Sequence, residues 1–174
     1  YNNLRTRLGG DERVATLEEP VERDQRHRLG GESRVGNFLA DALRTAVDAD
    51  AALFPAGLRD GPPLVGAVTL ADVISLCPFD DTIHELRLPP DQPRRVLADC
   101  GRDHPGDPGW VHVHVAGLRV RWDADGSLRS VRRADGSPLE DALHVATTGW
   151  FVLTDGYDPA NESHLVDDSV SMLG

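Results

Sequence analysis

The middle of the chain consists of short segments in which apolar and polar residues alternate. Residues 110–115, 118–122 and 128–133 read WVHVHV, LRVRW and LRSVRR, and Asp125-Gly126 joins the last two. A period of two places the apolar side chains on one face of a β-strand, and an Asp-Gly pair between two such segments is a strong hairpin signal. This stretch therefore predicts a run of antiparallel strands, and any fold of the chain has to accommodate it.

Three other segments have the pattern of helices. Residues 34–48 place apolar side chains at helical spacing, which predicts a helix that buries one face. Residues 69–72 have the Thr-x-x-Asp form of a helix start, and Pro78 ends the short helix that follows. Residues 90–100 carry prolines and an acid at the front and apolar residues behind, as a helix should. The sequence thus predicts a helix at each of these places.

Strands are also predicted at residues 50–54, 82–88 and 143–148. Helices and strands then follow one another before the antiparallel run, an order typical of the α+β class. A chain of 174 residues is long enough for one domain with a sizeable core. We therefore expect a single α+β domain over residues 32–174, with helices packed on a mixed, largely antiparallel sheet, and an interdomain connector over residues 1–31.

Charge and composition exclude several classes of partner. The net charge is -11 and the pI is about 4.9, so the chain would repel the phosphate backbone of a nucleic acid. The basic residues other than His are all Arg, which favours bidentate contacts, so a local cluster still permits a small anionic ligand. No apolar run approaches the roughly 18 residues of a membrane span. Cys77 and Cys100 lack metal-type spacing, which predicts no zinc module and leaves a single disulfide open.

No self-sufficient catalytic motif is present in the sequence. GxSxG is absent, and the phosphate loop GxxxxGK[ST] cannot form in a chain without Lys. His112 and His114 share one face of a predicted strand; they can present two imidazoles to a metal or line an ordinary polar face. Asp80 and Asp81 can be interpreted as a carboxylate pair, but adjacent side chains diverge on an extended chain, which favours a solvated turn. We therefore expect no catalytic residue and no metal site in this chain.

Three loops, each following a predicted helix or strand, carry side chains suited to a nucleotide. They span residues 55–61, 77–82 and 149–157 and supply two aromatic rings, a carboxylate, an Arg and flexible glycines. Two aromatic faces and a carboxylate fit a base held in a sandwich and a ribose whose two hydroxyls donate to the acid. The candidate binding residues are Gly57, Arg59, Phe79, Trp150, Asp155 and Gly156.

Each of these side chains also has an ordinary structural interpretation. Phe79 fits a core residue, Asp155 a turn residue and Arg59 a solvated surface charge. Phe151, beside Trp150, is interpreted as a core residue only. The nucleotide interpretation therefore depends on the joint occurrence of the three loops.

The same loops, in the same order, resemble motifs of the C-terminal domain of the 5'-nucleotidase family. The family pattern E-S-x-x-G-N at the start of a helix is matched by ESRVGN at residues 32–37. N-S-G-G-I-R, P-F-G-N, A-T-N-D-F and G-G-D-G-Y are matched by FPAGLR, PFDD, ATTGW and TDGY. The resemblance covers about residues 32–158, and VATLEEPVERD before it resembles the interdomain segment of the family. Several motifs in order are more specific than any one of them.

The resemblance implies a role for each loop. Phe79 and Trp150 would stack on the two sides of the nucleobase, because any aromatic face can stack on a base. Asp155 would hold the ribose hydroxyls, and Arg59 would lie near the phosphate. The implied ligand is a nucleotide or a nucleoside.

The sequence also departs from the family pattern at several positions. Phe54 replaces the Asn of N-S-G-G-I-R, Asp81 replaces the Asn of P-F-G-N, and Thr154 replaces a Gly of G-G-D-G. The loop before the acid is one residue shorter. An upstream Arg often helps to bind phosphate in the family, and Arg28 or Arg26 is the candidate here. These departures leave the preferred base open.

The resemblance places the chemistry outside this chain. The two divalent metal ions and the catalytic residues of the family belong to an N-terminal metallophosphoesterase domain, whose DxH, GNHD and GHxH motifs do not occur here. The sequence does not begin with Met and looks like a piece of a longer protein. This chain alone is therefore predicted to be inactive, with the missing domain as its partner. Family members are often periplasmic, secreted or at the cell surface, which leaves the compartment open.

Three functions follow from these observations. The first is a nucleotide-recognition domain of a 5'-nucleotidase-like hydrolase. The second keeps the domain and changes the substrate to a cyclic nucleotide, a nucleotide sugar or another phosphoester. The third is a binding module without a catalytic partner.

Overall fold

The computed structural model describes residues 9–23, 33–55, 61–78, 81–100, 113–123, 127–149 and 151, and the backbone of residues 165–171. The chain divides into two compact units, Tyr1–Val35 with Gly57–Phe79 and Gly36–Ala56 with Asp80–Gly174. Both units contain helix and strand, so the predicted α+β class is confirmed. The predicted boundary between a connector of residues 1–31 and a domain of residues 32–174 stays a prediction.

The first unit contains a two-stranded sheet that the sequence did not predict. β1 (Arg13–Val21) pairs antiparallel with β3 (Leu64–Thr69). The side chains of β1 are almost all exposed, and β3 is a short apolar run interrupted by Gly66. Because neither strand buries one clear face, neither shows the alternation from which a strand is predicted.

The helix α3 (Leu70–Leu76) begins at the helix start that the sequence predicts. Thr69 and Asp72 form a capping box, in which the Thr69 amide donates to Asp72 Oδ2 at 2.8 Å and the Asp72 amide donates to Thr69 Oγ1 at 3.3 Å. The first two amides of the helix donate to the carbonyls of Glu12 and Gly10, each at 2.8 Å. These bonds satisfy amides that have no partner inside a helix, and they fix α3 to the chain ahead of β1.

Arg23 holds the other end of α3. Its guanidinium donates to the carbonyl of Ser75 at 3.0 Å, although the residue is only 9% exposed. A Cβ on Gly61 would lie 2.8 Å from Arg23 Cζ, so the backbone of Gly61 packs directly on the guanidinium. Because Arg can donate to the last carbonyls of a helix, Arg23 is the C-terminal counterpart of the capping box.

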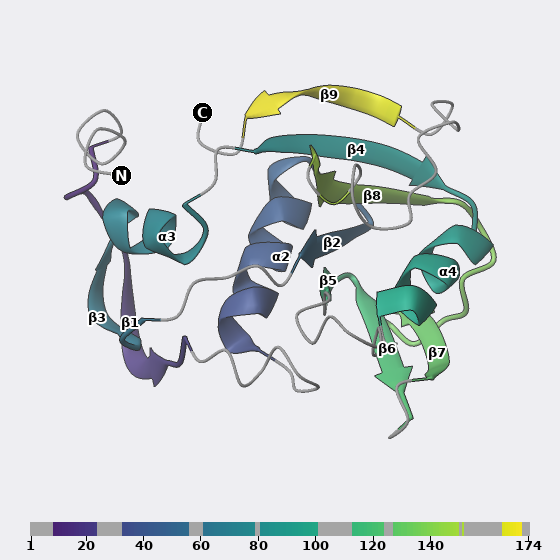
Figure 1. The fold of residues 1–174 in the computed structure, drawn as a ribbon, viewed down its shortest axis with the longest axis horizontal. Helices are drawn as coiled ribbons and strands as arrows, with labels where there is room; N and C mark the ends of the chain where they lie inside the picture. Colours follow the sequence, from purple (N-terminus) through teal and green to yellow (C-terminus); the bar gives the residue numbers. More distant parts are fainter. Residues whose placement is uncertain are drawn as a thin grey trace, which may run out of the picture. The chain divides into compact units, whose positions relative to one another are not determined.

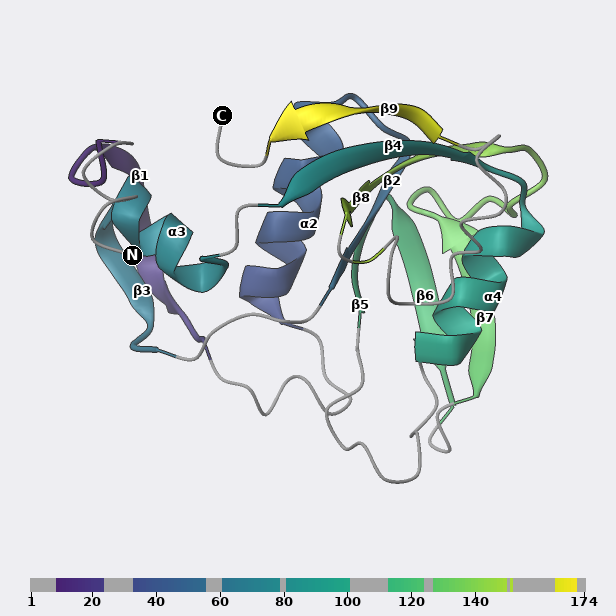
Figure 2. The same cartoon turned by 45° about the horizontal axis from the view of Figure 1, so that its top comes forward.

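The second unit is built on a five-stranded sheet with strand order β5-β2-β8-β4-β9 (Figure 1). The strands are β2 (Ala51–Pro55), β4 (Thr82–Leu88), β5 (Val113–Ala116), β8 (Leu143–Thr148) and β9 (Leu165–Ser171). β2 and β8 are parallel, whereas the other neighbouring pairs are antiparallel. The sheet is therefore mixed and largely antiparallel, as predicted. β4 and β9 lie side by side in both views (Figures 1 and 2).

The main hydrophobic core lies between one face of this sheet, the helix α4 (Asp91–Cys100) and the hairpin of β6 (Leu118–Trp122) and β7 (Leu128–Arg133). Its most buried members are Ala51, Leu53, Leu88, Leu97, Val131, Leu143 and Val145. Phe151 joins this cluster, which confirms its interpretation as a core residue. The indole of Trp122 donates to the carbonyl of Leu97 at 3.2 Å and ties the hairpin to α4.

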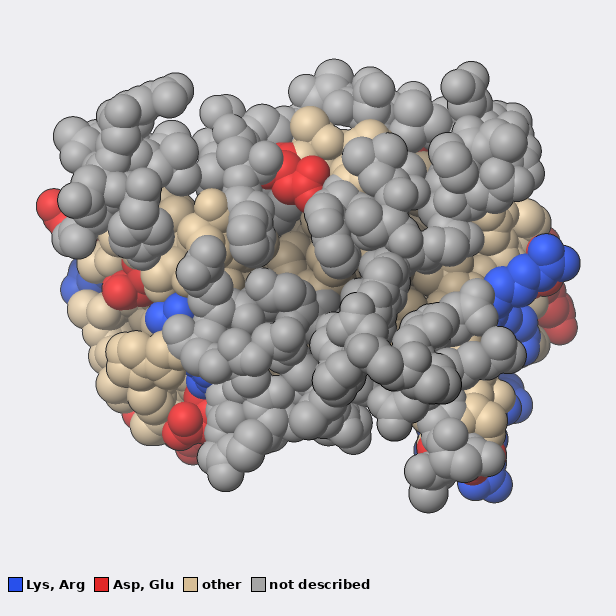
Figure 3. Space-filling view, viewed as in Figure 1, with Lys and Arg blue, Asp and Glu red and all other residues tan. Residues whose placement is uncertain are grey.

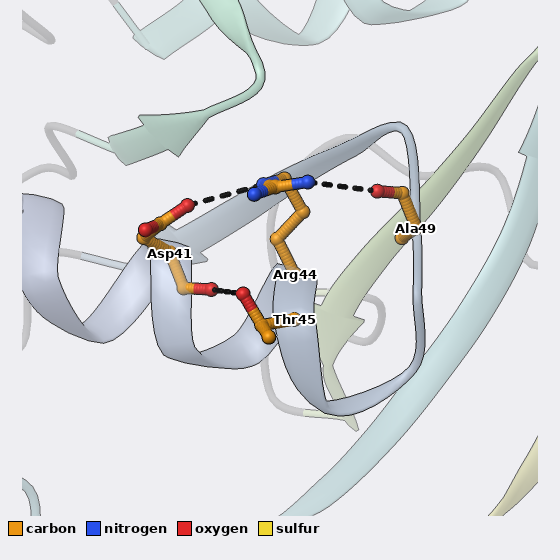
Figure 4. A network of polar contacts seen from close by, with 4 residues as sticks. All are labelled: Asp41, Arg44, Thr45 and Ala49. Atoms are coloured by element: carbon orange, nitrogen blue, oxygen red, sulfur yellow. Dashed lines mark hydrogen bonds and ion pairs between the residues drawn. The ribbon is translucent and has the colours of Figure 1, made fainter.

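The helix α2 (Arg34–Ala46) ends in a polar network that leads the chain into β2 (Figure 4). Arg44 donates through Nε to Asp41 Oδ1 at 3.1 Å and through Nη1 to the carbonyl of Ala49 at 3.4 Å. Thr45 Oγ1 donates to the carbonyl of Asp41 at 2.7 Å. The Arg44 fork thus joins the last turn of the helix to the residues that precede β2, and α2 lies beside β2 in both views (Figures 1 and 2).

α2 packs against β5 through a glycine. Gly36 lies in the first turn of α2, and a Cβ at this position would collide with the buried ring of His114. His114 lies opposite the buried Phe54 across the β2–β5 ladder. Since side chains alternate along a strand, both point away from the face that carries Val113 and the main core. α2 therefore covers the second face of the sheet, and Gly36 permits the close approach.

Most of the remaining predictions from the sequence agree with the structure. α2, α3 and α4 and strands β2, β4, β6, β7 and β8 lie where the sequence predicts them. β5 overlaps the strand predicted at residues 110–115, of which residues 110–112 lie outside the described residues, and β9 is a further strand that the sequence did not predict. Cys77 and Cys100 are free thiols, so the disulfide that the sequence left possible is not formed. Within the described residues, no helix combines the length and the apolar character needed to cross a membrane.

Gly36→Ala should lower the free energy of unfolding by about 1–3 kcal/mol, the usual cost of overpacking a filled site. The sign is diagnostic, because Gly→Ala inside a helix otherwise stabilises a protein by about 0.5–1 kcal/mol. Urea denaturation measures the difference, and the double variant with His114→Ala is the control, since removal of the ring makes room for the methyl group. A Gly36→Ala protein more stable than the parent would contradict the contact.

Candidate functional site

Three strand ends meet at one edge of the five-stranded sheet in the second unit. β2 and β8 are parallel, so Pro55 and Thr148 end their strands at the same edge. β4 is antiparallel to β8 with Ile83 opposite Thr148, so β4 begins where β8 ends. The chain therefore leaves β2, enters β4 and leaves β8 at one edge.

A cluster of polar side chains joins the start of β4 to the end of β8. Thr82 Oγ1 and His84 Nε2 are 2.9 Å apart, and the amide of Thr82 donates to Asp81 Oδ1 at 2.8 Å. Gly149 directly follows β8. A Cβ on Gly149 would lie 2.7 Å from Thr82 Oγ1, 2.9 Å from Asp81 Oδ1 and 3.0 Å from His84 Nε2. The backbone of Gly149 therefore packs on all three polar atoms, and a side chain there would displace them.

Thr147 extends the contact between β2 and β8 past the end of their backbone ladder. Its Oγ1 donates to the carbonyl of Leu53 at 2.8 Å, and the two residues are 1% and 2% exposed. The next hydroxyl along the chain, that of Thr148, accepts a weaker bond from the amide of Phe151 at 3.4 Å. Two consecutive hydroxyls thus fix the end of β8, one to the neighbouring strand and one to the residues that follow.

The predicted binding residues lie outside the described residues, and all of them except Arg28 belong to stretches of sequence that follow β2, precede β4 or follow β8. They are Gly57, Arg59, Phe79, Trp150, Asp155, Gly156 and the upstream Arg28. Their roles and mutual distances therefore stay predictions. The structure describes the residues next to these segments: Pro55 at the end of β2, Thr82 at the start of β4 and Gly149 after β8.

The residues that join the strand ends have no recognisable signature in the sequence. Thr82, His84 and Thr147 occupy positions that suit an ordinary strand, and nothing in their spacing shows that they lie close together. Only the pairing of β4 with β8 brings these residues together, because it places His84 opposite Thr147. The order of the predicted strands was the one feature of the sequence that could have suggested this pairing. Asp81 accepts the amide of Thr82 through its side chain, and Asp80 lies outside the described residues, so the interpretation of this pair as a solvated turn stays a prediction.

The structure also shows where two further residues of the sequence analysis lie, His114 and Phe54. His114 does not line a polar surface, because its ring is buried against Gly36, and its predicted companion His112 lies outside the described residues. Phe54, which replaces an Asn of the family pattern, is 1% exposed and packs in the core. In the part of the chain that is described, no three His, Cys, Asp or Glu side chains form a group that could hold a metal ion.

Positive charge gathers on the β6–β7 hairpin, away from these strand ends. The register places Arg119 opposite Arg132, and Arg121 shares their face because side chains alternate. Figure 3 shows Arg side chains where α4, β6 and β7 lie. β5 begins opposite Pro55, and β6 follows the other end of β5. The described residues thus bring little positive charge to the strand ends.

The turn after β7 contains a carboxyl whose pKa is lowered. The hydroxyl and the amide of Ser137 donate to Asp135 Oδ1 at 2.7 and 2.8 Å. These bonds favour the charged carboxylate and lower the pKa of Asp135, and the positive charges of Arg133 and Arg119 act in the same direction. Both hydrogen bonds lie within the turn that follows β7.

The chain matches a family model over most of its length. The model is described as 5'-nucleotidase, C-terminal domain, and it covers residues 13–158. The match begins at β1 and so includes part of the segment that the sequence analysis assigns to a connector.

Individual proteins match this chain with only part of their length. Endonuclease YhcR of Bacillus subtilis (strain 168) is 24% identical over an alignment of 149 residues that covers 79% of this chain and 11% of that protein. The structure of Haemophilus influenzae NAD nucleotidase (NadN) matches with a TM-score of 0.72 and 21% identity, over 94% of this chain and 34% of that one. A 5'-nucleotidase precursor from Thermus thermophilus matches with a TM-score of 0.67 and 21% identity, over 87% and 32%. At these identities the solved structures show a shared fold.

Thr147→Val should destabilise the second unit by about 1–3 kcal/mol, because it keeps the shape of the side chain and removes a donor from a buried carbonyl. Thr148→Val is the matched control: this neighbouring residue is equally buried and makes only the bond at 3.4 Å, so its replacement should cost less. Chemical denaturation of the two variants measures both costs. Equal costs would show that the Thr147–Leu53 bond does not strengthen the junction of β2 and β8.

Proposed function

Because the chain belongs to the 5'-nucleotidase C-terminal domain family, we propose that it is the nucleotide-recognition domain of a phosphohydrolase. The ligand is a nucleotide or nucleoside whose base lies between Phe79 and Trp150. Asp155 accepts the ribose hydroxyls, and Arg59 contacts the phosphate region. Gly57 and Gly156 belong to the same binding segments.

One observation carries this proposal: the strand ends next to the proposed binding segments lie at one edge of the sheet in the second unit. A base held between two rings requires two chain segments that approach each other. Thr82, three residues after Phe79, lies against Gly149, the residue before Trp150. The antiparallel ladder of β4 and β8 supports this approach on a rigid element, which suits a binding site better than two free loops.

Recognition and chemistry are separate in this proposal. The side chains of this domain hold the base and the ribose, while two divalent metal ions in a different domain of the full-length protein clamp the phosphate and activate water. This chain spans about a tenth of its curated relative and about a third of the solved chains that it matches, so other domains accompany the related ones. The domain would bring the scissile phosphate to the metal centre.

A second candidate function is the same recognition in an enzyme for a larger phosphoester. One relative is named an endonuclease, and Phe54 is a buried core residue where the family pattern has an amide. The recognised nucleotide would then be one unit of a longer substrate, or part of a cyclic nucleotide or a nucleotide sugar. A domain that binds without a catalytic partner would show the same recognition and no linked turnover.

Asp155→Ala in the full-length protein should weaken the binding of AMP by about 1.5–3 kcal/mol, the range for hydrogen bonds to a charged group. A 2',3'-dideoxy analogue should bind the parent and the variant equally, because it lacks the two hydroxyls. Calorimetric titration of both ligands measures the difference.

Phe79→Ala and Trp150→Ala are the matched controls for this experiment. Each should weaken both ligands by about 1–3 kcal/mol, because stacking does not sense the sugar hydroxyls. If Asp155→Ala lowers thermal stability and leaves the ribose preference intact, Asp155 is a turn residue and the proposal loses its ribose contact.

A further inference from the structure

His84 occupies an unusual place for a polar ring. It lies in β4 opposite Thr147, on the same face of the sheet as Leu86 and the main core. Its Nε2 is 2.9 Å from Thr82 Oγ1, whereas its Nδ1 is buried and has no hydrogen-bond partner among the described residues. A buried polar atom without a partner costs stability, so an apolar side chain would serve packing alone better. The bond to Thr82 is what the imidazole adds.

The buried Nδ1 favours one direction for that bond. A neutral imidazole has one N–H donor and one bare acceptor nitrogen. With the proton on Nδ1, a buried N–H would lack an acceptor, and such orphaned donors are rarer than orphaned acceptors. The tautomer with the proton on Nε2 avoids this and lets the ring donate to Thr82 Oγ1.

Thr82 transmits this restraint to Gly149. Its Oγ1 is the nearest atom to the place where a Cβ on Gly149 would lie, at 2.7 Å, and His84 Nε2 itself lies 3.0 Å from the same place. The paired residues of the β4–β8 ladder end at Ile83 opposite Thr148, so Gly149 is the first residue beyond the ladder. Beyond the ladder, the side chains of His84 and Thr82 contact the backbone of Gly149 in place of a paired strand.

We propose that His84 is a positioning residue for the nucleotide site: by holding Thr82 against Gly149, it sets the direction in which the chain leaves β8 toward Trp150. This inference rests on the proposed function, since Trp150 is one of the two proposed stacking residues. His84 does not itself contact the ligand. Its effect on binding passes through the backbone of Gly149.

The test uses variants of the full-length protein in which the hydrogen bond between His84 Nε2 and Thr82 Oγ1 is removed or replaced. His84→Leu removes both ring nitrogens, Thr82→Val removes the hydroxyl, and His84→Gln keeps an amide N–H at a similar reach. AMP, GMP, CMP and UMP are each titrated into the proteins, and hydrogen exchange of the amides of residues 149–151 is followed without ligand.

His144→Leu is the control for the loss of an imidazole. His144 lies in β8, and its Nε2 forms a hydrogen bond of 2.8 Å with Glu85 Oε2 in β4. It is next to Leu143, at the end of the ladder that is farther from Gly149. Its replacement should leave nucleotide affinity and exchange at residues 149–151 unchanged. A loss of affinity common to both Leu variants would indicate general destabilisation of the sheet and would overturn the proposal.

The expected result is a five- to tenfold loss of affinity in His84→Leu and in Thr82→Val, about the value of one hydrogen bond. The double variant should lose no more than either single variant, because both remove the same bond. His84→Gln should restore most of the affinity, and exchange at residues 149–151 should accelerate only in the variants without the bond. Unchanged affinity in Thr82→Val, or no recovery in His84→Gln, would overturn the positioning role.

The exchange measurement separates failure of this inference from failure of the proposed function. If none of the four nucleotides binds the parent protein, the proposed function is wrong, and exchange still reports whether His84 restrains Gly149. Faster exchange in both His84→Leu and Thr82→Val would support the restraint. Exchange equal to that of the parent would refute it, whatever the ligand.

Discussion

Six residue pairs join β4 to β8 in one antiparallel ladder, from Leu88 opposite Leu143 to Ile83 opposite Thr148. This ladder connects segments that are about sixty residues apart in the sequence, and one of its two middle pairs, Leu86 and Val145, belongs to the main core. At one end of the ladder the side chains of β4 contact the backbone that follows β8. The proposed recognition of a nucleotide depends on this pairing, because the two proposed stacking residues stand close to these strands in the sequence, Phe79 three residues before Thr82 and Trp150 two residues after Thr148.

Local signals in the sequence predicted much of the fold. Thr69 and Asp72 were visible as a helix start and form the capping box of α3, and the alternation around Asp125-Gly126 predicted the hairpin of β6 and β7. β1 was missed because its side chains are almost all exposed, so it lacks an apolar face that would reveal a strand. The parallel pairing of β2 with β8 was missed for another reason: it depends on a contact between distant segments that no local pattern encodes.

Some residues of the candidate site could likewise be predicted from the sequence, and others could not. Aromatic and acidic residues in three loops are recognisable from their types and their order, and the family match over residues 13–158 agrees with the resemblance that those motifs predicted. The groups that hold the strand ends together have no such signature. Thr147 is an ordinary strand residue until its hydroxyl meets the carbonyl of Leu53, and Gly149 is an ordinary glycine until three polar atoms surround the place of its Cβ.

We propose that the segments next to these strand ends present two rings to a nucleobase. The decisive measurement is a crystal structure of the full-length protein with a bound nucleotide. Phe79 and Trp150 should face each other across a gap of about 7 Å, filled by the base, with the ribose hydroxyls on Asp155. If either ring lies in the hydrophobic core, or if the base binds elsewhere, the recognition role assigned to this domain is wrong.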